Sequence, residues 1–188
     1  ITYNAAISAC EKCQQWAQAL ALLSVLRERR LPADEVSFCA TISACEKAEQ
    51  WAWALRLLAE MRQKVPSEPG LIAYNAALSA CEKGRQWQRA VDVLSDMRHR
   101  GIELDLISYC ATMICCEQSF QWERALLLLR ELTQRGFEPN IPTLNAGFRA
   151  SEKGGLRARG LALLQGMQLQ AAGSLQALPA PGLRAGLA

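Results

Sequence analysis

Apolar residues recur along the chain at helical spacing, in pairs of short segments separated by a polar break. Tyr3, Ile7 and Cys10 share one helix face in the first segment, and the second segment begins near Trp16 and ends in arginines before Pro32. This spacing predicts two helices and a proline stop in each unit, and therefore an all-α fold. We expect the first helix of each unit to begin at a Thr or Ser N-cap: Thr2, Ser37, Ser108 and Thr143.

The helical pair repeats along the chain. Residues 3–12 align with 38–47, 74–83, 109–118 and 144–153, at intervals of 35, 36, 35 and 35 residues. A period in the thirties indicates a solenoid of stacked units, because one unit alone cannot bury its apolar face. A tryptophan preceded by Gln keeps the same interval: Trp16, Trp51, Trp87 and Trp122. We place repeats at 1–34, 35–70, 71–105 and 106–140, a degenerate fifth at 141–170, and a tail at 171–188 that we expect to be disordered.

The composition is that of a folded, soluble protein. Hydrophobic residues make up 51% of the chain and charged residues 21%, and the longest apolar run near the middle, Ala125 to Leu129, is far too short to span a membrane. The net charge of +3 means that any binding of nucleic acid must come from local placement of charge. Because residue 1 is Ile and no basic leader precedes the repeats, we expect an internal fragment of a longer protein.

The eight cysteines indicate packing rather than chemistry. Cys10, Cys45, Cys81 and Cys116 recur in phase, so we expect reduced, buried thiols that lie too far apart in stacked repeats for disulfides. Cys10 and Cys13 form a lone CxxC, and His99 is the single histidine, which argues against a metal site. With no nucleophile–base set and no phosphate loop, we expect no catalytic activity, no cofactor and no small-molecule substrate.

Further positions of the repeat are characteristic: the opening Ile1-Thr2-Tyr3-Asn4, the pair Ala19-Leu20, and a late methionine in later units, at Met61, Met97 and Met167. In these residues the repeat sequence resembles the pentatricopeptide repeat family over residues 1 to about 168. The tryptophans depart from the family, which usually has Leu there, and the second unit has an extra residue within 65–69. The resemblance implies a right-handed α-solenoid that binds single-stranded RNA, one base per repeat.

In this family the base is read by the fifth and the last residue of each unit. The fifth positions here are Asn4, Cys39, Asn75, Cys110 and Asn145. The last positions are Asp34, Gly70, Asp105 and Asn140, and Asn145 has no clear partner. Asn with Asp is the family's combination for uracil, so units one and three are expected to read it. Thiols are weak donors and acceptors, so units two and four are expected to discriminate little.

The resemblance also implies contacts on either side of each base. Aliphatic residues at the second position sandwich the base in the family and are matched by Ile1, Val36, Ile72 and Ile107, with Pro142 interrupting the row. A lysine that approaches the RNA backbone is matched by Lys12, Lys47, Lys83 and Lys153, with Gln118 the exception. Eight residues separate the reader from the lysine, about 800° of rotation, which returns to within roughly 80° of the same helix face.

Each of these residues also has a purely structural interpretation. The asparagines could cap their own helices, the lysines could line a solvated face, and the tryptophans are expected to pack between helices rather than stack on bases. Arg98 and Arg100 suit a helix C-terminus.

The main hypothesis is single-stranded RNA binding in organellar (plastid or mitochondrial) RNA processing, stabilisation, editing or translation, with no membrane partner. The alternatives are a protein-binding scaffold, which low net charge favours, and the RNA-positioning arm of a larger processing enzyme.

Overall fold

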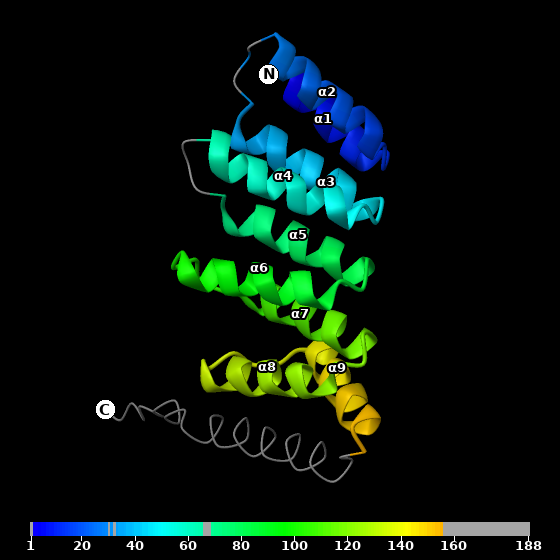
Figure 1. The fold of residues 1–188 in the computed structure, drawn as a ribbon, viewed down its shortest axis with the longest axis vertical. Helices are drawn as coiled ribbons and strands as arrows, with labels where there is room; N and C mark the ends of the chain where they lie inside the picture. Colours follow the sequence, from blue (N-terminus) through cyan, green and yellow to red (C-terminus); the bar gives the residue numbers. More distant parts are fainter. Residues whose placement is uncertain (1, 30, 32, 66–68, 156–188) are drawn as a thin grey trace, which may run out of the picture.

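The computed structural model describes residues 2–29, 31, 33–65 and 69–155, and within them it contains nine α-helices and no strand (Figure 1). The second half of the predicted fifth repeat and the tail at 171–188 lie outside the described residues. The helices are α1 (Thr2–Lys12), α2 (Trp16–Glu28), α3 (Glu35–Lys47), α4 (Trp51–Lys64), α5 (Leu71–Lys83), α6 (Trp87–His99), α7 (Leu106–Gln118), α8 (Trp122–Gln134) and α9 (Ile141–Lys153).

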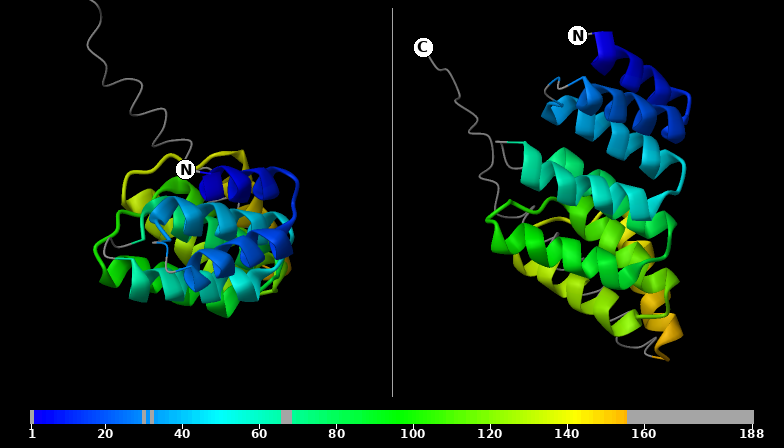
Figure 2. Two further views of the ribbon diagram at one scale, coloured as in Figure 1. Left: turned by 90° about the horizontal axis from the view of Figure 1, so that it is seen from above. Right: turned by 45° about the horizontal axis from the view of Figure 1, so that its top comes forward.

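The helices form a two-layered stack. Each odd-numbered helix packs against the next odd-numbered helix, so that α1, α3, α5, α7 and α9 make a continuous inner layer. Each even-numbered helix packs on the first helix of its own unit and on that of the next, and the described even-numbered helices make no close backbone contact with one another. The units follow one another along a single axis (Figures 1 and 2). The predicted all-α solenoid is therefore confirmed.

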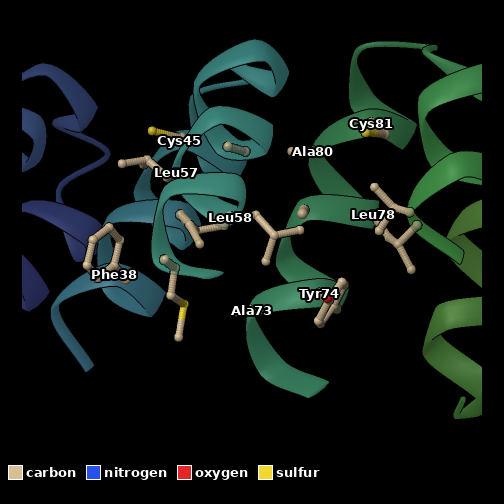
Figure 3. Packing of buried hydrophobic residues seen from close by; sticks show 14 of the residues in the cluster. Phe38, Cys45, Leu57, Leu58, Ala73, Tyr74, Leu78, Ala80 and Cys81 are labelled. Atoms are coloured by element: carbon tan, nitrogen blue, oxygen red, sulfur yellow. The ribbon is translucent and has the colours of Figure 1, made fainter. Parts of the chain in front are cut away.

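Small residues at recurring positions allow this close packing. An alanine is the fourth residue of each described second helix and is completely buried: Ala19, Ala54, Ala90 and Ala125. Large side chains of the first helices fill the space between units, as Phe38, Tyr74 and Leu78 do in Figure 3. The main core therefore extends from Ile7 in α1 to Leu132 in α8, and two smaller clusters pack α9 against α7 and α8.

The tryptophans pack between helices, as expected. Each begins a second helix and lies half-buried against the core. A methyl group added at Gly84 would overlap the indole of Trp51, and one added at Gly154 would overlap that of Trp122. The two glycines end α5 and α9, so these indoles fill the space between one second helix and the following first helix. This close fit favours a structural role over base stacking.

The expected Ser and Thr N-caps are wrong. The caps are Asp34, Asp105 and Asn140, whose side chains accept from the backbone N–H three residues later, at Ser37, Ser108 and Thr143. Asp and Asn are as favourable at the N-cap as Ser, because their side-chain oxygens also accept from backbone N–H groups of the first turn. The helices thus begin earlier than expected, and the hydroxyl residues lie inside the first turn. Thr2 is the first residue of α1, and the residue before it is not described.

Arginines near the ends of the second helices join neighbouring repeats. Arg27 pairs with Glu60 at 2.7 Å and Arg62 with Asp96 at 3.0 Å, and the same contact recurs between Arg98 and Glu131. Asp96 also accepts from the buried Tyr74 of the inner layer at 2.9 Å, and Glu131 accepts from the buried Tyr109 at 2.8 Å. These arginines therefore bind carboxylates of the next unit in addition to lying near a helix C-terminus.

No helix in the described part of the chain has the length and apolar character needed to cross a membrane.

Candidate nucleic-acid interface

Asn4 and Asp34, one in the first turn of α1 and the other at the N-cap of α3, are brought together by the stacking of the first two units. Asn4 Nδ2 donates to Asp34 Oδ2 at 2.9 Å and lies 3.2 Å from Oδ1. Ser37 Oγ lies 2.6 Å from Asn4 Oδ1 and 2.7 Å from Asp34 Oδ1, and its single proton is donated to one of them at a time. The amide thus binds the next unit's cap instead of capping its own backbone.

The same triad recurs two units later. Asn75 Nδ2 lies 3.0 and 3.2 Å from the carboxylate oxygens of Asp105, and Ser108 Oγ lies 2.8 Å from Asn75 Oδ1. Asp105 also accepts from the backbone N–H of Ser108 at 2.8 Å. The structure therefore joins both Asn–Asp pairs that the sequence placed in phase. Sequence reasoning took Ser37 and Ser108 for N-caps and missed their role in the triads, although their recurrence three residues after Asp34 and Asp105 was a visible signal.

The carboxylate of the first triad is held in its charged form. Burial alone would raise the pKa of Asp34, but hydrogen bonds from the side chain and backbone of Ser37 and from Asn4 outweigh it and lower the pKa. A charged acceptor beside an amide with a second N–H offers both donor and acceptor atoms at the surface. The triad therefore has the functional groups needed to contact the edge of a base.

The intervening units lack this arrangement. Cys39 and Cys110 occupy the fifth positions as half-buried thiols, and burial, with smaller effects of Glu35 and Asp34, raises the pKa of Cys39 to about 11. Gly70 carries no side chain, and the Asn140 side chain accepts from Thr143 in capping α9. No contact in the described part of the chain joins Cys110 to Asn140 or gives exposed Asn145 a partner. The structure thus separates the units into two with an Asn–Asp–Ser triad and two with a thiol.

An aliphatic side chain is exposed beside each described cap. Val36 is 55% exposed, Ile72 72% and Ile107 57%, although such residues are usually buried. Ile141, which sequence reasoning did not include, is 75% exposed and precedes Pro142 at the point where the row was expected to break. Ile1 lies outside the described residues. The exposed aliphatic row therefore follows the caps along the inner layer.

The lysines assigned to an RNA backbone are bound to glutamates of the preceding unit. Lys47 Nζ lies 2.9 Å from Glu11, Lys83 lies 2.6 Å from Glu46, and Lys153 lies 2.7 Å from Glu117. The signal for this contact is the recurring Glu-Lys dipeptide, since stacking places each lysine beside the glutamate one repeat and one residue earlier. Lys12, in the first unit, has no acidic partner among the described residues. Three of the four lysines are thus already paired.

The buried cysteines of the inner layer pack in the core. Burial raises the pKa of Cys45 to about 11 and that of Cys81 to about 12, so both thiols stay protonated at neutral pH. In the CxxC segment, Cys13 is exposed and Cys10 is half-buried. The described residues hold no group of His, Cys, Asp and Glu arranged to bind a metal ion.

Comparison with known families agrees with the repeat geometry. A PPR repeat model matches residues 1–31, 36–64 and 72–102, and a pentatricopeptide repeat domain model matches residues 92–150. The chain belongs to the pentatricopeptide repeat family. A search of curated proteins finds no match to this member of the family.

Solved pentatricopeptide repeat structures share the fold. Maize PPR10 is 23% identical, with a TM-score of 0.60 over 90% of this chain and 29% of its own. PPR10 in complex with an 18-nt psaJ RNA element is 15% identical, with a TM-score of 0.69 over 89% of this chain. The PPR domain of Arabidopsis thaliana protein-only RNase P 1, in complex with tRNA, is 15% identical, with a TM-score of 0.76 over 88% of this chain and 86% of its own. The chain spans about a quarter of the length of the RNA-bound PPR10 chain.

Proposed function

We propose that this pentatricopeptide repeat array binds single-stranded RNA along its inner layer, one nucleotide per unit, and reads uracil at units one and three. The observation that carries the proposal is the recurrence of the Asn–Asp–Ser triad two units apart, at an open surface beside exposed aliphatic residues. PPR10 and the PPR domain of RNase P 1, which share the fold, were both crystallised with RNA. Family membership and these complexes support RNA as the ligand.

The chemistry of the triads suits uracil. Its Watson–Crick edge presents one N–H donor between two carbonyl acceptors, and an amide and a carboxylate together offer the complementary groups. The exposed Val36, Ile72 and Ile107 supply apolar contact with the faces of the bases. Units two and four, with a thiol at the fifth position, make few such hydrogen bonds, so the preferred core is U-n-U-n with the first unit at the 5′ end.

The affinity of this short array is expected to be low. Two specified bases contribute about 1–3 kcal/mol each, by analogy with base contacts in DNA. Four lysine–phosphate contacts would give a slope of log affinity against log salt of about −3. Because Lys47, Lys83 and Lys153 are ion-paired, we expect a shallower slope. Recognition should therefore depend more on bases than on the backbone.

The test is a fluorescence-anisotropy titration of short U-n-U-n RNAs against wild type and Asn75→Ala. We expect Asn75→Ala to abolish the preference for U at the third nucleotide while leaving the preference at the first intact. Gln88→Ala, which removes an exposed amide from α6, is the matched control and should leave both preferences unchanged. Equal affinity of wild type for U-n-U-n and for strands with both uracils replaced would contradict base reading.

The cellular role that we propose is processing, stabilisation, editing or translation of plastid or mitochondrial transcripts. An array of RNA-binding repeats would act by covering RNA or by positioning it for an enzyme, as the arm of a larger processing protein does. Fluorescent tagging of the full-length protein tests the compartment. Crosslinking and sequencing of bound RNA tests the target, and recovery of transcripts from neither organelle would overturn this part of the proposal.

A protein-binding scaffold is the second candidate. The ion pairs of three lysines leave the inner layer with little free positive charge, and the exposed aliphatic row would suit a peptide as well as bases. Selection from a random RNA pool separates the two functions. Enrichment of U-n-U-n sequences supports RNA binding, whereas a failure to enrich any sequence favours the scaffold.

A further inference from the structure

The inner layer contains a second regular feature, a series of glutamates in line with the base-reading positions. In each unit the glutamate follows the fifth position by seven residues, giving Glu11, Glu46, Glu82, Glu117 and Glu152. Seven residues make about 700° of helical rotation, so the glutamate lies within roughly 20° of the reader's face and about 10 Å along the helix. This alignment is closer than that of the lysine, which follows by eight residues. An acidic group therefore accompanies each base-reading position.

The glutamates of three units are neutralised by a lysine of the following unit. Lys47, Lys83 and Lys153 bind Glu11, Glu46 and Glu117 at 2.6 to 2.9 Å. The lysine that would bind Glu82 is replaced by Gln118, the single exception in the lysine series. Among the described residues Glu82 has no ion-pair partner, because the adjacent Lys83 binds Glu46 of the preceding unit. The series is thus interrupted in the third unit.

The surroundings of Glu82 do not replace the missing lysine. The side chain is partly buried on α5, and it interacts electrostatically with Glu46 of the preceding unit and with the Cys110 thiol of the following one. Burial raises the pKa of Glu82, Lys83 lowers it and Glu46 raises it further. A carboxylate that is poorly solvated and not neutralised exerts a stronger field than one in a surface ion pair. One unbalanced negative charge therefore lies near the centre of the array.

We propose that Glu82 repels the RNA phosphates next to the third nucleotide, so that binding at this unit depends on recognition of the base by Asn75 and Asp105. This inference rests on the proposed RNA binding. A repulsive charge two helical turns from the reader penalises every strand equally, so it lowers every affinity and leaves the ratio between right and wrong bases unchanged. At a given RNA concentration, a strand without the right base then fails to bind at this unit, whereas a strand with the right base still binds. Glu82 thus reduces binding to the backbone.

The experiment compares Glu82→Gln with Gln118→Lys, which restores the missing ion pair, and with Glu123→Gln, which removes an exposed charge from the outer helix α8. We expect the first two variants to bind U-n-U-n RNA about two- to fivefold more tightly than wild type at low salt. The gain should shrink as salt is raised, since the interaction is screened. Glu123→Gln should bind as wild type does.

A neutral linkage identifies the phosphates involved. When the two linkages that flank the third nucleotide are methylphosphonates, no charge remains there to be repelled, and the advantage of Glu82→Gln should disappear. An advantage of equal size on charged and neutral strands would overturn the role of Glu82. Equal, measurable binding by all four proteins would also overturn it and leave the proposed function intact. Absence of binding by every protein at low salt would overturn the proposed function together with this inference.

Discussion

The double use of Asp105 allows a quantitative test of how the site is held together. Its carboxylate caps α7 by accepting from the backbone N–H of Ser108 at 2.8 Å, and it accepts from Asn75 Nδ2 at 3.0 Å across the repeat interface. Loss of an N-cap costs about 1 kcal/mol. Loss of one further hydrogen bond costs about 0.5–1.5 kcal/mol. We therefore expect Asp105→Ala to lower the free energy of unfolding by about 1.5–2.5 kcal/mol.

Two more variants separate the two contributions. Asp105→Ser retains a hydroxyl that can cap the helix and loses the carboxylate that accepts from Asn75, so we expect a cost of about 0.5–1.5 kcal/mol. Asn75→Ala loses the same contact from the other side. The double variant Asp105→Ser/Asn75→Ala should therefore lose less free energy of unfolding than the two single variants lose in sum. Urea unfolding followed by circular dichroism measures the stability of the wild type and of the four variants. Equal stabilities of Asp105→Ala and Asp105→Ser would refute the capping contribution, and additive single costs would refute the bond to Asn75.

Three further predictions concern packing, pH and the thiols. Gly84→Ala should destabilise the protein by about 1–3 kcal/mol in urea unfolding, because the new methyl group overlaps Trp51. Burial, followed by the hydrogen bond to Asp96, raises the pKa of Tyr74 from 10.0 to about 12. The stability that this shift supplies is complete below pH 10 and is lost as the pH rises towards 12, so Tyr74→Phe should show a shallower alkaline loss. In the native protein, a thiol reagent should modify Cys13 quickly and the completely buried thiols only after unfolding: Cys45, Cys81, Cys115 and Cys116.

Helix boundaries were the part of the fold where sequence reasoning went wrong. Ser37 and Ser108 are good N-cap residues, and nothing local distinguishes them from Asp34 and Asp105 three positions earlier. The choice depends on where the chain leaves the preceding helix and on which side chain meets the asparagine of the preceding unit. Those are properties of the stack, so the caps could be identified only in the folded protein.

The sequence by itself determined the helical pairs and the repeat, and the family resemblance added the pairing of Asn4 with Asp34 and of Asn75 with Asp105. Periodicity is sufficient for the helical pairs and the repeat, because helical spacing places apolar residues on one face and a constant repeat length places equivalent residues in equivalent positions. Only the tertiary structure decided which lysines of the inner layer are ion-paired. Whether a lysine is free depends on what lies within about 4 Å of its ammonium group, and that neighbour belongs to another repeat. The ion pairs of Lys47, Lys83 and Lys153 with glutamates of the preceding unit follow from the register of stacking between units. Glu82 lacks such a partner because Gln118 replaces the lysine in the sequence.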